Sequence, residues 1–294
     1  TGRCNTAVGR NSLSANTAAC NNTAVGYNSL RDNTTGDLNT SIGQCSMALN
    51  TVGDRNVAVG ASALRDYNPS SNQDSYNVAV GQQSAVLSTT VCQNTSVGGL
   101  SLRDNTTGIT HTAVGFCALA KNTTSSCNTA VGAYAMRQNT TGACNTALGR
   151  NALCNNTTAN NNTAVGLCSL QANTTGATNT SVGSSAGLSN TTGSKNAFFG
   201  NSAGQNNTEG YENTALGSLA GKSLTTGSNN TAVGREALEA NTTANSNTAV
   251  GSCSLYANTT GGANTAVGAF ALDSNTTAYA NTAIGCDALQ TNTV

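Results

Sequence analysis

Few side chains in this 294-residue chain are suited to catalysis, and they do not gather in a catalytic pattern. His111 is the only histidine, the residue that most readily exchanges protons near neutral pH. It stands where other repeats of the chain carry asparagine, and no carboxylate or cysteine recurs with it at a catalytic spacing. The acidic residues are scattered, so the pattern shows no pair of carboxylates for acid–base catalysis. We therefore expect a protein that is not an enzyme, with His111 in a structural position.

The 11 cysteines could in principle bind a metal or form disulfides. They form no CxxC pair and no cluster with histidine, which argues against zinc, and we expect no metal and no other cofactor. Two interpretations stay open: small buried apolar residues, or disulfides formed in an oxidising compartment. Cys127 and Cys144 hold equivalent positions in neighbouring repeats, so we predict a bond between them. Cys4 and Cys20 are a weaker candidate pair, one position out of phase.

Asparagine-linked glycosylation sequons form a third chemical pattern. If the source glycosylates its proteins, they predict a column of glycans along one edge of the fold. The alternative is plain turn chemistry, which Asn and Thr also favour. Nine of them share one position of the repeat, at Asn33, Asn105, Asn122, Asn139, Asn173, Asn190, Asn241, Asn258 and Asn275.

A 17-residue repeat built on Asn-Thr-Ala-Val-Gly organises the chain. Its closing glycines lie 17 residues apart, except that 21 residues separate Gly60 from Gly81. A fixed short period indicates a solenoid. We expect one repeat domain, residues 1–294, with a four-residue insertion near 67–76 that bulges as a tolerated loop or, alternatively, serves as a contact loop. The closing glycines are Gly9, Gly26, Gly43, Gly60, Gly81, Gly98, Gly115, Gly132, Gly149, Gly166, Gly183, Gly200, Gly217, Gly234, Gly251, Gly268 and Gly285.

Counted from the closing glycine as position 0, each unit predicts one coil of an all-β, parallel β-solenoid (a β-roll or β-helix). Positions −4 to −1 alternate as a strand does, and Thr and Val favour strands. A second short strand is expected around the Leu at +4, and turns at the glycine and at the Asn-Thr-Thr-Gly group of +7 to +10. The chain therefore predicts 17 coils of 17 residues, with Val at −1 facing Leu at +4 across a thin core. The representative core residues are Val8, Leu13, Val25, Leu30, Val131, Leu170 and Phe199.

One irregularity supports this assignment of the core. The Leu at +4 is replaced by Gly187, Gly204 and Gly221 in three consecutive coils, and the middle coil carries Phe198 and Phe199. Phe199, at −1, is predicted to be buried and to restore the missing volume.

The composition of the chain limits the classes of partner that it is expected to bind. Charged residues make up 8% of the chain and the formal net charge is zero, which argues against nucleic acid and anionic membranes. No apolar run approaches the roughly 20 residues that span a bilayer, so membrane insertion is not expected. Low charge favours assembly.

The motif Asn-Thr-Ala-Val-Gly-x-x-Ala/Ser resembles the Ser-Val-Ala-Ile-Gly-x-x-Ala repeat in the heads of trimeric autotransporter adhesins. It is also similar to repeats in phage and algal-virus tail-fibre proteins, and more weakly to grass ice-binding solenoids. The adhesin and tail-fibre resemblance implies a left-handed coil, frequently trimeric, on a cell or virion surface. Here the 17-residue coil, the Asn-Thr-Thr-Gly turn and the cysteines depart from that pattern.

We therefore expect a structural subunit of an extracellular fibre or surface appendage, with an adhesive or protective role. The chain begins and ends inside a repeat, which suggests a segment of a longer product or a homopolymer that stacks head to tail, with lateral or trimeric association as a further option. The alternatives are a ligand-binding solenoid, with ice or a surface glycan as the partner, and a shaft or head segment of a phage or virus tail fibre. Ice binding would require Thr at −3 and Val at −1 to point outward, leaving only Ala and Leu for a core that we judge too thin.

Overall fold

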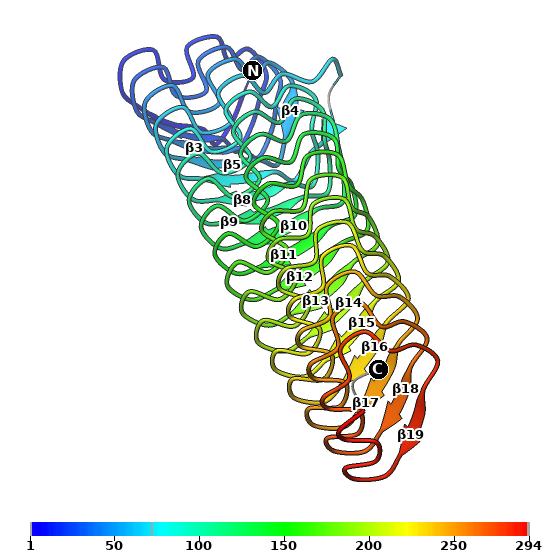
Figure 1. The fold of residues 1–294 in the computed structure, drawn as a ribbon. Helices are drawn as coiled ribbons and strands as arrows, with labels where there is room; N and C mark the ends of the chain where they lie inside the picture. Colours follow the sequence, from blue (N-terminus) through cyan, green and yellow to red (C-terminus); the bar gives the residue numbers. More distant parts are fainter. Residues whose placement is uncertain (1, 72, 293–294) are drawn as a thin grey trace. The chain divides into compact units, whose positions relative to one another are not determined.

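The computed structural model describes residues 2–71 and 73–292 and shows a parallel β-solenoid of about 16 turns, without helices in the described ranges. The chain divides into two compact units, residues 1–145 and 146–294. Figure 1 shows the same construction in each: short strands stacked side by side, with long loops returning the chain from one strand to the next. The all-β solenoid predicted from the repeat is confirmed.

The first unit contributes eight strands to the solenoid and the second unit nine. Those of the first unit are β1 (Thr6–Val8), β2 (Thr23–Val25), β3 (Thr40–Ile42), β5 (Val57–Val59), β7 (Val78–Val80), β8 (Thr95–Val97), β9 (Thr112–Val114) and β10 (Thr129–Val131). Those of the second are β11 (Thr146–Leu148), β12 (Thr163–Val165), β13 (Thr180–Val182), β14 (Ala197–Phe199), β15 (Thr214–Leu216), β16 (Thr231–Val233), β17 (Thr248–Val250), β18 (Thr265–Val267) and β19 (Thr282–Ile284). Two further short strands, β4 (Gly53–Asp54) and β6 (Gln73–Asp74), pair with each other.

Within each unit, consecutive coils stack in exact repeat register. Thr6, Ala7 and Val8 lie beside Thr23, Ala24 and Val25, and the same pairing runs on through the stack. The insertion after Gly60 leaves this register intact, because β5 pairs directly with β7. The insertion thus leaves the pairing of β5 with β7 unbroken, and residue 72 lies outside the described residues.

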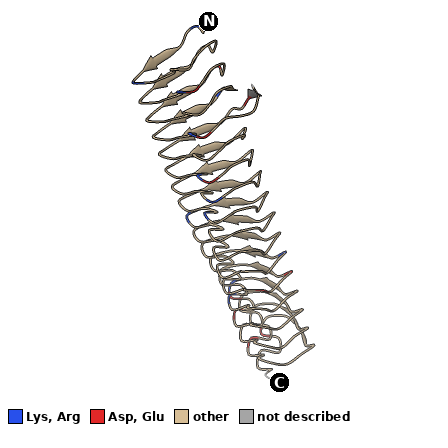
Figure 2. Cartoon of the chain, turned by 90° about the horizontal axis from the view of Figure 1, so that it is seen from above, with Lys and Arg blue, Asp and Glu red and all other residues tan. Residues whose placement is uncertain are grey.

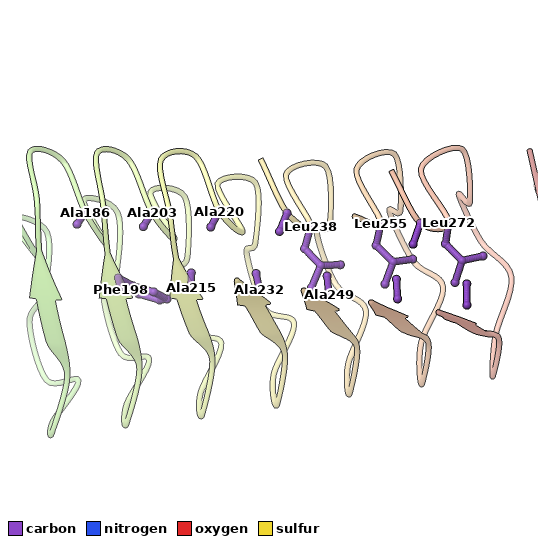
Figure 3. Close-up of a cluster of buried hydrophobic side chains, with 14 residues drawn as sticks. Ala186, Phe198, Ala203, Ala215, Ala220, Ala232, Leu238, Ala249, Leu255 and Leu272 are labelled. Carbon is purple, nitrogen blue, oxygen red and sulfur yellow. The ribbon is translucent and has the colours of Figure 1, made fainter. Parts of the chain in front are cut away.

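The interior of the coil is narrow, and this decides which residues fill it. The small residue at −2 points inward and is fully buried, as at Ala232 and Ala249. Opposite it, the Leu at +4 reaches across toward the strands, as Leu238, Leu255 and Leu272 do in Figure 3. A small residue facing a large one fills the space at close packing without forcing the two walls apart.

The predicted orientation of the strand was therefore wrong by one residue. Leu13, Leu30 and Leu170 are buried as expected, but Val8 is 57% exposed, Val25 and Val131 are only partly buried, and Phe199 is 37% exposed. Alternation shows that −3 and −1 share one face of the strand, but not which face is inside. Since the interior at −2 accepts Ala or Ser, Thr and Val are turned outward.

The second strand predicted around +4 does not form, because the backbone there turns. Leu30 has a φ of 50°, and its counterparts in other coils take the same left-handed conformation. The closing glycine is required for two reasons, shown by Gly26. Its φ is +129°, and a Cβ there would lie 2.6 Å from the carbonyl oxygen of Gly43 in the next coil.

Two ladders of buried asparagines fill the rest of the interior. At −4, Asn22 Oδ1 accepts a hydrogen bond from the backbone N–H of Asn39 in the next coil at 2.9 Å, and its Nδ2 donates to the Gly36 carbonyl at 2.8 Å. At +7, Asn50 Nδ2 donates to Asn33 Oδ1 at 2.9 Å. Each carboxamide thus joins neighbouring coils and satisfies a turn carbonyl, so these buried polar groups stabilise the stack.

Three coils without Leu at +4 use other side chains to fill the core. The buried residue is Phe198, at −2, and not Phe199. A Cβ on Gly187 would lie 2.9 Å from the Phe198 ring, so the glycine makes room for it. In the third coil Leu224 replaces the +7 asparagine and packs beside Gly221. The compensation predicted from sequence is present, but through different residues.

Candidate functional site

The outward face of the strands is the most regular surface of each unit. It consists of two columns, Thr at −3 and an aliphatic residue at −1, one of each per coil (in β12, Thr163 and Val165). We call it the Thr–Val face. β-Branched side chains have few χ1 rotamers, so the columns are stiff as well as aligned. Thr at −3 gives way to Val57, Val78 and Ala197 only.

The hydroxyl groups of the Thr–Val face are available to a ligand. In the described chain, the −3 threonines make no side-chain hydrogen bond, in contrast to the +8 threonines, whose hydroxyls bond the next coil, as Thr34 Oγ1 does to the Thr51 carbonyl at 3.0 Å. The strands of this face carry no charged residue, and Figure 2 shows charge only on the loops and the short strands outside it. The face can offer hydroxyls and methyl groups on a neutral lattice.

His111 takes the place of an asparagine in the −4 ladder, as its sequence position predicts. Its Nδ1 accepts a hydrogen bond from the Asn128 backbone N–H at 3.2 Å, and Nε2 lies 2.7 Å from the Ser125 carbonyl, to which it donates. His111 Nδ1 thus accepts as Asn22 Oδ1 does, and His111 Nε2 donates as Asn22 Nδ2 does. Burial lowers the pKa of His111, outweighing the effect of the bonds to Ser125 and Asn128, which act to raise it. The neutral imidazole is therefore a structural member of the ladder.

The predicted glycosylation column is incompatible with this fold. The nine asparagines of that column are fully buried, and in Asn33, Asn105 and Asn173 the Nδ2 atom that would carry the glycan donates to a turn carbonyl. A glycan on that nitrogen would remove the bond and could not fit inside the coil. The turn interpretation therefore accounts for the nine sequons of this column, Asn33, Asn105, Asn122, Asn139, Asn173, Asn190, Asn241, Asn258 and Asn275.

The predicted disulfides are also absent, since no two cysteines of the described residues lie at disulfide distance. Cys127 and Cys144 are exposed on consecutive coils, and Cys4 and Cys20 are likewise unbonded. Residues stacked in register lie about 4.8 Å apart with parallel side chains, whereas a disulfide draws its Cβ atoms to about 3.8 Å. In-register stacking thus disfavours the bond. Cys117 and Cys253 are buried, and burial raises the pKa of both thiols.

Arginine–aspartate neighbours at +5 and +6 form half-exposed ion pairs within their own coils, such as Arg31 Nε to Asp32 Oδ1 at 2.7 Å. The Arg31 guanidinium lowers the pKa of Asp32 by hydrogen bonding to it. Exposed pairs of this kind contribute little to stability.

The described residues lack two further kinds of feature. No group of three or more His, Cys, Asp or Glu side chains there could hold a metal ion. No helix in that part of the chain is long and apolar enough to cross a bilayer.

No protein-family model matches the chain, and no curated protein matches its sequence.

Proposed function

We propose that the chain is a structural subunit of an extracellular fibre or surface appendage, with an adhesive or protective role. The observation that carries this proposal is the continuous bonding from coil to coil. Backbone ladders link successive coils in each unit, and runs of two asparagine ladders add side-chain bonds between coils. Such stacking produces a rigid element whose length scales with the number of repeats.

The same stacking supports the proposal of head-to-tail association. β1 pairs with β2, and β19 pairs with β18, so one edge of each of these two strands has no partner in the described chain. An open parallel edge is a template for another strand. A further coil, from a second molecule or from the same polypeptide, would extend the ladders, and a heterologous contact of this kind forms filaments. Lateral or trimeric association, which the resemblance to adhesin heads implies, is compatible with this arrangement.

Electron microscopy of the purified chain at increasing concentration tests the proposal. Filaments one solenoid wide are expected. An Ala7→Pro substitution should shorten them: Thr6 and Val8 turn their backbone groups toward β2, so the Ala7 N–H faces the open edge of β1, and Pro removes that donor. The matched control is Ala164→Pro, which places the same change in an interior coil, where it should impair folding and not only assembly. Single particles at every concentration would contradict the fibre proposal.

Ice binding is a second candidate function, favoured by the Thr–Val face. The objection drawn from sequence was that an Ala and Leu core would be too thin, but the core has this composition. The outward columns then supply aligned hydroxyl and methyl groups about 4.8 Å apart on an uncharged surface. That arrangement suits a neutral lattice of ordered water.

Thermal hysteresis separates this candidate from the fibre proposal. Thr163→Tyr and Thr248→Tyr would break the −3 column, whereas Thr175→Tyr changes an exposed threonine on a turn. Ice binding predicts hysteresis in the wild type, lost in the first two variants and retained in the third. No hysteresis in the wild type would exclude ice binding and leave the fibre proposal standing.

A further inference from the structure

A surface pocket lies along the turn edge of the second unit, away from the Thr–Val face. It has a volume of about 320 Å³ and spans three successive coils. Its lining includes Asn245, Ser246, Thr260, Gly262, Ala263 and Tyr279. We call it the Tyr279 pocket.

The pocket exists because one side chain is missing from a column. Position +11 carries Asn245, Gly262 and Tyr279 in these three coils, so the glycine leaves a gap between two larger residues. A Cβ on Gly262 would lie 3.1 Å from Cε1 of Tyr279 and 3.2 Å from the Asn245 carbonyl oxygen. The φ of Gly262 is outside the left-handed region, so its backbone does not require glycine.

The lining combines an aromatic ring with unused polar groups. Tyr279 is 65% exposed although its edge covers Gly262. Asn245 Oδ1 accepts from the Ser228 backbone N–H at 2.7 Å, which fixes the carboxamide, while its Nδ2 makes no hydrogen bond with the described residues. The hydroxyls of Ser246 and Thr260 are likewise unbonded in the described chain.

These groups match one class of ligand. No charged side chain lines the pocket, so neither an anion nor a cation finds a counter-charge there. Amide and hydroxyl groups exchange hydrogen bonds with sugar hydroxyls, and a tyrosine ring packs against the apolar C–H face of a pyranose. Pockets that combine aromatic surface with a few placed polar groups are the usual form of small-ligand sites.

We propose that the Tyr279 pocket binds a neutral saccharide, with Tyr279 as the stacking platform and Asn245, Ser246 and Thr260 as the hydrogen-bonding groups. The site lies within coils of one unit and does not require filament formation, so it goes beyond the fibre proposal. It would give the adhesive role a defined ligand class.

Binding to a printed array of neutral glucan, mannan and galactan oligosaccharides, with sialylated and sulfated ones alongside, tests the proposal. The wild type should bind neutral oligosaccharides, and the strongest of them is then titrated by calorimetry. Tyr279→Ala should weaken binding roughly tenfold or more, since it removes the platform. Gly262→Ala should do the same by filling the gap, without removing any group that bonds the ligand.

Tyr211→Ala is the matched control. Tyr211 holds the same position +11 and is 51% exposed, but Ser194 and Ser228 flank it in that column and leave no glycine gap. Affinity should be unchanged in this variant, and circular dichroism should show all variants folded. No binding to any neutral oligosaccharide, preference for the charged ones, or equal affinity in Gly262→Ala and the wild type would overturn the proposal. Whether filaments form in the same preparation tests the fibre proposal separately.

Discussion

His111 shows how a single position can change its residue type without changing its role. The imidazole reproduces both hydrogen bonds of the asparagine ladder, but only in its neutral form, because Nδ1 must accept the Asn128 N–H. Protonation would turn that acceptor into a donor facing another donor. The ladder is therefore sensitive to pH at this one coil.

The first prediction follows from the lowered pKa of His111. Below the ordinary pKa of histidine, about 6.5, the unfolded chain takes up a proton that the folded chain resists. The contribution of neutral His111 to stability is thus complete above that pH and is lost as pH falls toward the folded-state pKa. His111→Asn should match the wild type within about 1 kcal/mol at pH 8 and exceed it at pH 5.

Urea unfolding of the two proteins at both pH values checks this. Comparing wild type with variant cancels the titration of all other groups. If the difference in unfolding free energy is the same at pH 5 and pH 8, the neutral-ladder account of His111 is wrong.

The second prediction distinguishes the two adjacent phenylalanines. Phe198 is fully buried beside Gly187 and Gly204, so Phe198→Ala should cost about 3–5 kcal/mol of unfolding free energy. Phe199 is 37% exposed on the Thr–Val face, and Phe199→Ala should cost less than about 1.5 kcal/mol. Denaturant unfolding measures both, each variant serving as control for the other. Equal losses would contradict the inward orientation of −2.

At the scale of the coil, one leucine takes the place of a ladder asparagine. It fills the space that a core leucine fills in other coils. Leu224 stands at +7 beside Gly221, and it fills the space that the +4 leucine occupies elsewhere. The ladder is interrupted as a result: Asn207 Oδ1, which would accept from an asparagine at 224, is buried without a partner.

The third prediction is a double-mutant cycle at this site. Leu224→Asn alone should cost about 2 kcal/mol or more, since it opens a cavity, although it supplies the missing donor to Asn207. Gly221→Leu alone should also destabilise, because a Cβ there would lie 2.8 Å from Cδ1 of Leu224. The double variant rebuilds the common coil and should recover most of both losses. Additive losses would show that the two positions do not share one space.

Sequence reasoning could predict the coil but not which face of its strand is inside. The period, the turn glycine and the buried leucines follow from spacing and residue type. Either of two alternating columns, Ala at −2 or Val at −1, could have formed the core. The sequence prediction placed the more apolar Val column inside, and this was wrong. The deciding signal was in the sequence: Phe198 at −2 coincides with Gly204 at +4, which couples those positions across the core.

The buried asparagines were missed for a related reason. Asn-Thr-Thr-Gly is ordinary turn chemistry in a single repeat, and only stacking turns its asparagine inward as a ladder. A sequon is a property of three consecutive residues, whereas the ladder depends on the neighbouring coils. The Tyr279 pocket likewise needs three coils to be seen, because it lies in the gap that one glycine leaves in a column.

At the scale of the whole molecule, the account depends on coils that continue to stack from one subunit to the next. Successive coils use the same backbone pairing, so the first and last described strands offer the edges that an interior strand offers to its neighbour. Filament growth along the solenoid axis would therefore need no new type of contact.

X-ray fibre diffraction from an aligned, concentrated preparation tests this central claim most directly. Head-to-tail stacking of coils predicts a strong meridional reflection at about 4.8 Å, because the parallel strands succeed one another along the fibre axis. The Thr–Val columns would then run along the fibre. Fibres that place this spacing on the equator, or solutions that yield only isolated particles and no oriented pattern, would contradict it.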